Sequence, residues 1–286
     1  MSKATAYYEK KSKRERRANL ATYIVLIFMV LIINIPFLQM IMTSFKTRAE
    51  AMSSTNFFPS RLSFENFEMV LMRTNFSTNI INSFIVSIVV TVACIMFSVM
   101  AGYAISRFKG RVFNAYTTFM LVLQLFPGVL MLIPLFVIMR NLNLIDKLPS
   151  VMLAYTATNL PFSIWLLKGF FNSIPFDIEQ AGMIDGCSQF GTFWRLVLPI
   201  SMPGVSTVAI FTFINAWCEF TVASILLRSD GVMTITVGLQ KFVQQYTQDW
   251  PALMAASTLS SLPTLIFLMI AQKYLVQGMG AGSVKG

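Results

Sequence analysis

The chain has 286 residues and a formal net charge of +10, yet only 12% of its residues are charged and 56% are hydrophobic. A soluble domain could not bury so much apolar surface and a disordered chain would be polar, so the composition indicates an integral membrane protein. The sequence has no histidine, which excludes imidazole catalysis and histidine-based zinc sites. Because Cys94, Cys187 and Cys218 are widely spaced, we expect no disulfide framework, metal centre or bound cofactor.

The first element is a basic segment followed by an apolar one. Residues 1–19 contain seven lysines and arginines, and residues 20–45 are almost entirely apolar. The apolar stretch is longer than the roughly 7–15 residues of a signal-peptide core, so we expect a retained transmembrane helix behind a cytoplasmic N-terminus. No basic run is interleaved with aromatic residues, and we therefore expect membrane lipid as a neighbour and no nucleic acid.

Five further stretches are long and apolar enough to span a membrane. They are residues 78–105, 115–139, 150–167, 203–227 and 252–272. The sequence therefore predicts an all-α membrane protein with six transmembrane helices. We expect an extracytoplasmic segment at 46–77, a five-helix core over 78–272 and a C-terminal tail at 273–286.

The distribution of lysine and arginine predicts the orientation. With the N-terminus inside, the inner segments 1–19, 106–114, 168–202 and 273–286 hold 14 basic residues, against 8 in the outer segments. Cytoplasmic loops of membrane proteins carry the excess of positive charge. We therefore expect both termini to be cytoplasmic.

The inner loop 168–202 carries the most informative local pattern. Pro175 is followed by two carboxylates, which is typical of a helix start, and Asp185-Gly186 is a helix-stop signal. Ser188 suits the N-cap of a second short helix. The apolar residues of that helix fall at i, i+3, i+4 and i+7, which predicts one amphipathic face: Phe190, Phe193, Trp194 and Val197. An alternative is that this helix only rests on lipid head groups.

The spacing within this loop resembles the EAA-type loop of ABC importer permeases. The pattern there is Glu-Ala-Ala, three residues, Gly, nine residues and Ile-x-Leu-Pro. Aligned on Gly186, Gln180 stands where the motif has Glu, and Glu179 could supply the missing charge. The resemblance implies that this loop contacts an ATPase through the following residues: Glu179, Gln180, Ala181, Gly182, Asp185, Gly186, Leu198 and Pro199.

Four other segments extend the resemblance, at 101–108, 160–165, 217–220 and 272–286. They are similar to the maltose-type (MalG-like) sugar importer permeases of bacterial inner membranes. This resemblance implies a type I ABC importer (MetI-like) permease fold and transport of maltose, maltodextrin or similar oligosaccharides. It also implies an F-type partner permease, two cytoplasmic ATPase subunits and an extracytoplasmic sugar-binding protein. The tail residues that it brings to the ATPases are Val284, Lys285 and Gly286.

The chain has no Gly-x-x-x-x-Gly-Lys-Ser/Thr phosphate loop. We therefore expect a transporter subunit and not an enzyme, with ATP hydrolysis carried out by its partners.

Glu219 is the one acidic residue within the predicted spans. Carboxylates inside membranes usually face a cavity or a partner, so Glu219, Asn215 and Trp217 form a candidate substrate path. The alternative is a hydrogen bond that fixes the helices. The same two readings apply to Asn79 and Asn82.

Three other functions stay open at this point. A secondary transporter or channel would require several ionisable groups within the spans, and only Glu219 is present. A membrane enzyme would require convergent catalytic groups at one depth. An ABC permease for another small polar solute, such as a polyol phosphate, is the remaining alternative.

Overall fold

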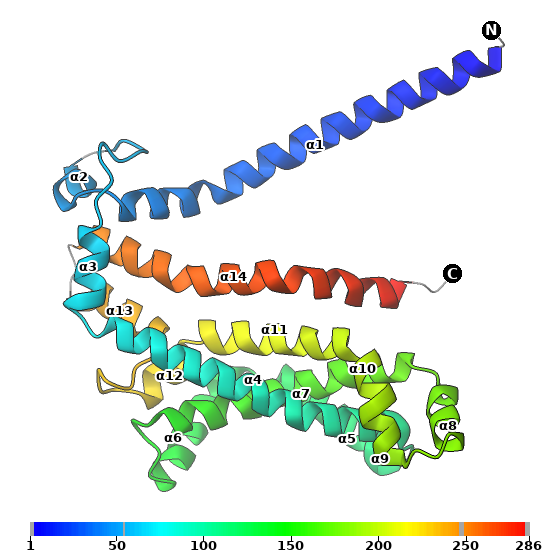
Figure 1. Ribbon diagram of the computed structural model, residues 1–286. Coiled ribbons are helices and arrows are strands. Elements are labelled where there is room, and N and C mark those ends of the chain that lie inside the picture. Colours follow the sequence, from blue (N-terminus) through cyan, green and yellow to red (C-terminus); the bar gives the residue numbers. More distant parts are fainter. Residues whose placement is uncertain (1–2, 54, 246–248, 284–286) are drawn as a thin grey trace. The chain divides into compact units, whose positions relative to one another are not determined.

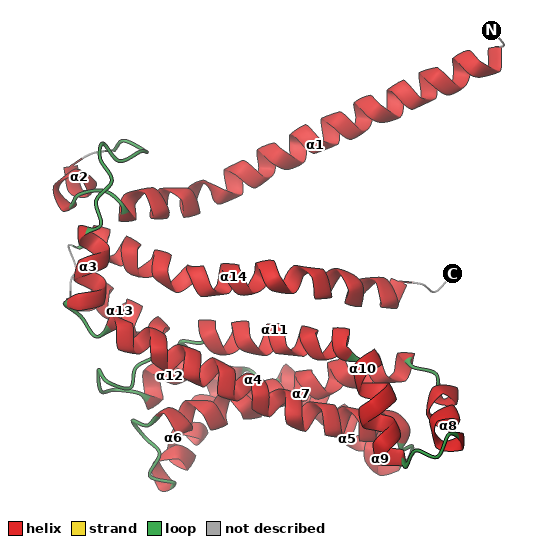
Figure 2. Cartoon of the chain, viewed as in Figure 1, coloured by secondary structure: helices red, strands yellow, loops and turns green. Residues whose placement is uncertain are grey.

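The computed structural model describes residues 3–53, 55–245 and 249–283, and the regular elements in these ranges are all helices (Figures 1 and 2). The chain divides into two units. One comprises Met1–Phe67 with Trp250–Thr258, and the other comprises Glu68–Asp249 with Leu259–Gly286. The prediction of an all-α membrane protein is confirmed.

The first unit contains a long helix followed by a short segment that is held by hydrogen bonds and aromatic contacts. Its helices are α1 (Lys3–Ser44), α2 (Arg48–Ser53) and the start of α3 (Glu65–Met72). The buried Asn66 side chain donates hydrogen bonds to the carbonyl oxygens of Ser44 (3.0 Å) and Lys46 (2.7 Å). The ring of Phe45 packs against Phe64 and Phe67. These contacts fold the chain back on itself after the first predicted span.

The second unit is built on three helices that pack side by side: α4 (Phe76–Arg107), α7 (Leu148–Ser173) and α11 (Met202–Cys218) (Figure 1). Its core contains Val86, Val90, Val151, Tyr155 and Ala216. Gly102 lets α4 approach α7 closely, since a Cβ at this position would lie 3.1 Å from the Cβ of Leu167. The remaining helices of this unit surround the three or lie at their ends. They are α5 (Arg111–Leu125), η1 (Gly128–Met131), α6 (Leu132–Asn141), α8 (Phe176–Ile184), α9 (Gln189–Thr192), η2 (Phe193–Val197), α10 (Leu198–Ile200), α12 (Thr221–Leu226), α13 (Ile235–Gln245) and the greater part of α14 (Trp250–Ser283).

Among the described residues, four helical segments are long and apolar enough to cross a membrane: Thr22–Ser44, Phe76–Arg107, Leu148–Ser173 and Trp250–Ile270. Two bent helix pairs raise this number to six if each pair is one span. Arg111–Leu125 and Gly128–Asn141 meet at 96°, and Gln189–Ile200 and Met202–Cys218 meet at 70°.

Two predicted spans are broken in the structure. The span predicted over 115–139 is bent within its length, where Pro127 has no N–H and Phe126 before it is extended (ψ 127°). The span predicted over 203–227 stops at Cys218, and Glu219 is extended (ψ 128°) before α12 begins. The second break places Glu219 between two helices instead of inside one.

Candidate functional site

The loop between α7 and α11 folds as a helical projection at the C-terminal end of α4 (Figure 1). Pro175 precedes α8 in an extended conformation, and the helix ends at Ile184, with Asp185 as its C-cap. Gly186 then adopts a φ of +89° and donates a hydrogen bond to the Met183 carbonyl, while Cys187 donates to the Gly182 carbonyl. This pair of bonds is the Schellman motif, in which glycine takes the left-handed position without steric cost. The bend predicted at Gly186 is therefore present.

The second half of the projection begins at Ser188, as predicted. The Ser188 Oγ accepts a hydrogen bond from the Gly191 N–H at 3.1 Å, which is an N-cap interaction. The predicted amphipathic face is wrong in part. Phe193 and Val197 are buried, whereas Phe190 is 67% and Trp194 is 49% exposed. The cause is the π-helical turn η2, because its i→i+5 bonding interrupts the 3.6-residue period on which the prediction rested.

Glu179 fastens this projection to α4. Its side chain is 2% exposed and accepts hydrogen bonds from Arg107 Nε at 2.5 Å and from the Tyr103 hydroxyl at 2.7 Å. Arg107 also donates to the Ile174 carbonyl oxygen at 3.3 Å. A buried carboxylate is stable only when it is paired and hydrogen-bonded, and here both oxygens have partners. We call Tyr103, Arg107 and Glu179 the Glu179 joint.

Aromatic contacts extend the Glu179 joint to the neighbouring elements. The Tyr103 ring lies 4.4 Å from the Phe193 ring and 5.7 Å from the Phe171 ring, measured between centroids. The end of α7, the start of α8 and η2 therefore all meet the last turn of α4 in one place.

The residues of the EAA-type motif divide into a buried and an exposed set. Gly182, which stands where the motif has its second alanine, is buried, and a Cβ at this position would lie 2.6 Å from Leu196 Cδ1 and 3.2 Å from Thr192 Cγ2. Leu198 is half-buried and Pro199 is exposed. The exposed set lies around the C-terminal end of α8: Gln180, Ala181, Asp185 and Gly186.

Sequence reasoning missed three members of this region. Ile184 is 85% exposed beside the exposed motif residues, and Tyr103 and Arg107 hold Glu179 from another helix. Ile184 could have been found as an apolar residue next to the Asp185-Gly186 stop. The pairing with Arg107 has no local signal, because it joins residues 72 positions apart.

Glu219 caps a helix at the break between α11 and α12. Its Oε1 accepts from the Val222 N–H at 2.8 Å, and its Oε2 accepts from the Ala223 N–H at 3.2 Å and from the Tyr155 hydroxyl at 2.6 Å. Its backbone carbonyl accepts from the Thr236 hydroxyl at 2.7 Å. This one residue therefore joins α7, α11, α12 and α13.

The three candidate residues of the substrate path have different partners and differ in exposure. Asn215 is exposed, and its amide donates to Asn159 Oδ1 at 3.2 Å. Trp217 is 2% exposed, stacks on Phe213, and donates its indole N–H to the Ser260 carbonyl at 3.1 Å. Since Trp217 is enclosed by other side chains, its ring is not free to stack on a ligand.

Two further predictions concern Asn82 and the C-terminus. The Asn82 amide donates to the carbonyl oxygens of Gly231 (3.1 Å) and Met233 (3.0 Å), so it holds the segment before α13 against α4. The predicted ATPase-contacting tail, Val284, Lys285 and Gly286, lies outside the described residues.

Within the part of the chain that is described, no group of three or more Cys, Asp or Glu side chains could hold a metal ion.

Comparison with known proteins identifies the family. Residues 94–281 match the model of the binding-protein-dependent transport system inner membrane component. The sulfoquinovosyl glycerol transport system permease protein of Agrobacterium fabrum is 34% identical, over 90% of this chain and 91% of that protein. The trehalose/maltose transport system permease protein of Thermococcus litoralis is 33% identical, over 91% of this chain and 94% of that protein.

The fold also matches a solved structure. A chain of a bacterial ABC transporter involved in the import of the acidic polysaccharide alginate superimposes with a TM-score of 0.79 at 22% identity, over 91% of this chain and 97% of that one. The predicted type I importer permease fold is therefore confirmed. This chain belongs to the family of binding-protein-dependent transport system inner membrane components, which are ABC importer permease subunits and not enzymes.

Proposed function

We propose that this chain forms the transmembrane path of an ABC importer for small oligosaccharides or glycosides, together with a second, F-type permease. The named cargoes of the two relatives above, sulfoquinovosyl glycerol and trehalose or maltose, all contain a sugar ring. Maltose and maltodextrin are members of this class. An extracytoplasmic sugar-binding protein would deliver the cargo, in keeping with a binding-protein-dependent family.

The Glu179 joint is the observation that carries the proposed coupling to two cytoplasmic ATPases. One face of α8 is fixed to α4 by a buried ion pair, while the other carries the exposed Gln180, Ala181 and Asp185. A short helix that docks in a groove transmits rigid-body motion only if it is held firmly at its base. We propose that the ATPase binds this exposed face and that its movement reaches α4 through Glu179.

The proposed topology follows from the charge distribution. We propose that residues 1–19, the loop 168–202 and the tail 273–286 are cytoplasmic, with 46–77 outside and the helical core over 78–272. The excess of basic residues on the inner segments supports this orientation. The tail residues Val284, Lys285 and Gly286 would then reach the ATPases.

Of the residues proposed for the substrate path, Asn215 is the one we assign to cargo. It is exposed on α11 with an amide that can bond to hydroxyl groups. We propose that Glu219 and Trp217 act by holding the helices around it, since their polar atoms are occupied by other parts of the chain.

Replacing Gly186 by proline tests the coupling. Proline cannot adopt a φ of +89° and lacks the N–H that bonds to the Met183 carbonyl, so the Schellman motif cannot form. We expect Gly186→Pro to abolish sugar uptake while the complex still assembles in the membrane. Gly128→Ala is the matched control, because Gly128 has open space around it and no positive φ. Unchanged uptake in Gly186→Pro would refute the coupling role.

The cargo is tested by uptake of radiolabelled sugars in cells that lack the chromosomal gene and carry it on a plasmid. A panel of maltose, maltotriose, trehalose and a sulfonated glycoside covers the proposed class. A phosphorylated polyol covers the alternative. Uptake of the polyol phosphate alone would overturn the assignment to sugars.

A further inference from the structure

An apolar groove lies between α4, α5 and α7 and encloses about 390 Å³. Its floor is formed by Met120 and Ile164, which are buried and belong to one core cluster. Its walls include Phe97, Tyr116 and Phe119, and these side chains are between 48% and 57% exposed. Because the walls keep much of their surface, an occupant of the groove can contact them directly.

A lysine stands at one end of the groove. On α7, Ala157 and Ile164 line the groove, and Lys168 follows one turn later on the same face. The half-buried Lys168 donates from its Nζ to the Thr117 hydroxyl of α5 at 3.3 Å, next to the groove residue Tyr116. It has no carboxylate partner within the ranges that the structure describes. A cation in a spanning helix is costly without a counter-charge, so a bound anion would stabilise it.

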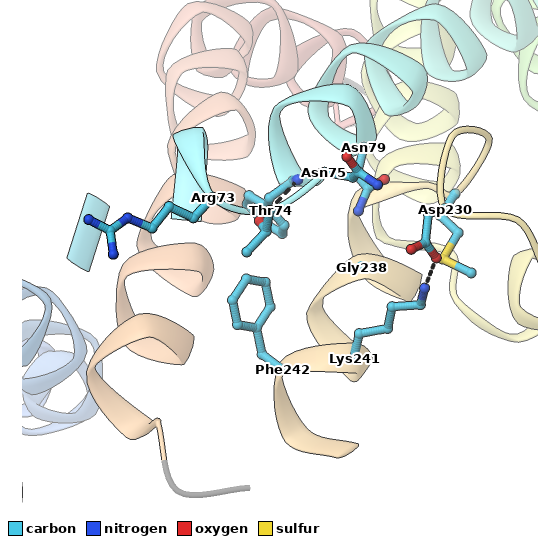
Figure 3. A pocket seen from close by; sticks show the side chains of 10 residues that line it. Arg73, Thr74, Asn75, Asn79, Asp230, Gly238, Lys241 and Phe242 are labelled. Atoms are coloured by element: carbon cyan, nitrogen blue, oxygen red, sulfur yellow. Dashed lines mark hydrogen bonds and ion pairs between the residues drawn. The ribbon is translucent and has the colours of Figure 1, made fainter. Parts of the chain in front are cut away.

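The polar pocket at the N-terminal end of α4 has the opposite arrangement (Figure 3). There Lys241 forms an ion pair with Asp230, so its charge is balanced within the chain. The rings of Phe76 and Phe242 are buried against each other, with centroids 5.6 Å apart. Of these two pockets, the groove is therefore the one that combines accessible apolar walls with a cation in need of an anion.

The length of the groove matches one leaflet of a membrane. At about 1.5 Å of rise per helical residue, Ile164 lies about 6 Å and Ala157 about 17 Å from Lys168 along α7. Half of the hydrocarbon core of a bilayer is about 15 Å thick. Lys168 itself lies about 8 Å before the end of α7 at Ser173, where lysine side chains of spanning helices reach the head groups.

We propose that this groove binds one anionic phospholipid, with an acyl chain against α5 and α7 and the phosphate on Lys168. Basic pockets between transmembrane helices on the cytoplasmic side bind acidic lipid head groups. A sugar is a poor fit, because Tyr116 alone among the lining side chains carries a hydrogen-bonding group. An apolar helix of another subunit would leave Lys168 without an anion. The assignment to the cytoplasmic leaflet rests on the proposed topology.

The first test maps the lipid on the assembled complex of both permeases and the ATPases. The complex is placed in nanodiscs of phosphatidylcholine with a phosphatidylglycerol probe that carries a diazirine in its acyl chain. We expect photolabelled peptides from α5 around Phe119 and from α7 around Ala157. Labelling of other helices alone would overturn the proposal. So would a photoreactive residue at position 119 that crosslinks only to the second permease, because the groove would then be covered by protein.

The second test removes the cation. Lys168→Met keeps the apolar stem, and one lysine near a membrane surface contributes about fivefold to the binding of an acidic lipid. The preference of the groove for phosphatidylglycerol over phosphatidylcholine, measured by competition with the probe, should therefore fall by about fivefold. Lys147→Met is the matched control, because it makes the same change at an exposed lysine at the opposite end of α7. An unchanged preference in Lys168→Met would refute the contact with the phosphate.

The third test fills the groove. Ala157→Phe adds a ring from an exposed position and should reduce the labelling several-fold, whereas Ala115→Phe, at an exposed alanine of α5 outside the groove, should not. Full labelling of Ala157→Phe with an unchanged thermal midpoint would overturn the proposal; if this variant unfolds, Lys168→Met decides.

Two further outcomes are distinguished in the same samples. Inorganic phosphate should leave the labelling unchanged, and displacement of the probe by phosphate would overturn the assignment to a lipid. Labelling requires no transport. Its failure therefore refutes only the lipid site, and failed sugar uptake with intact labelling refutes only the proposed function.

Discussion

Two glutamates in this chain satisfy their carboxylate oxygens with different kinds of hydrogen-bond partner. Glu179 and Glu219 each accept a hydrogen bond from a tyrosine hydroxyl, at 2.7 Å and 2.6 Å. Glu179 completes its bonding with the Arg107 side chain, which belongs to another helix. Glu219 instead accepts from two backbone N–H groups at the start of α12, a few residues further along the chain.

The difference bears on the coupling that we propose. The ion pair of Glu179 connects residues that are 72 positions apart, so in the proposed coupling a displacement of α8 would reach α4 through it. Glu219 stabilises the start of α12 and so preserves a break in the path of the chain. We therefore interpret Glu179 as a link between two helices that could move together, and Glu219 as a residue that stabilises the break between α11 and α12.

Removing Arg107 should have the largest effect. Arg107→Met leaves the Glu179 carboxylate buried without its cation, and breaking a buried pair from one side costs about 3–5 kcal/mol. We expect a large drop in the thermal midpoint of the complex and loss of sugar-stimulated ATPase activity. Arg111→Met is the matched control, because Arg111 is an exposed arginine only four positions away.

A double variant sharpens this test. Arg107→Met with Glu179→Met removes both charges, so the stability should recover in large part while the coupling stays weak. Equal stability losses in the single and double variants would show that the pair is not a mutually dependent link.

Glu219→Gln should have an intermediate effect. Glutamine has one acceptor oxygen, so its amide group must face either the Tyr155 hydroxyl or the N–H groups of α12. We expect a loss of about 1–2 kcal/mol in stability, as for a lost helix cap. Tyr155→Phe should cost less, since it removes one of the three partners. Impaired transport with an unchanged thermal midpoint would contradict the structural role and favour contact with cargo.

The sequence predicts the local features of these sites well and the distant ones poorly. The Ser188 cap and the Gly186 turn depend on neighbouring residues only, and both are present. Pro127 is visible in the sequence, but membrane helices tolerate proline when other groups satisfy the backbone, so its presence alone does not predict the 96° bend. The Arg107–Glu179 pair is a tertiary contact, and the charge of neither residue indicates its partner.

A third carboxylate, Asp146, extends the comparison to a hydrogen-bonded clamp between two loops near the surface. Its Oδ1 accepts from the N–H groups of Arg228 and Ser229, both at 2.8 Å, and the Ser229 hydroxyl bonds to its Oδ2. The side-chain bond from Ser229, followed by the two backbone bonds, lowers the pKa of Asp146 below its usual value of 3.8. This clamp joins the loop before α7 to the loop after α12.

Asp146→Asn should have the smallest effect of the three. Asparagine keeps an oxygen for both N–H groups and loses only the acceptor for the Ser229 hydroxyl, so we expect about 0.5 kcal/mol at this partly exposed site. Because the folded-state pKa of Asp146 is depressed, its contribution is complete well above pH 3.8 and is lost as the pH falls through the folded value. The thermal midpoints of the two proteins should therefore differ at pH 7 and converge in strong acid. A difference between the two thermal midpoints that persists unchanged below pH 3 would mean that the ionised carboxylate is not the source of the clamp's stability. Ser229→Ala removes the same side-chain bond from the other side. In that case its effect on the thermal midpoint should also be independent of pH.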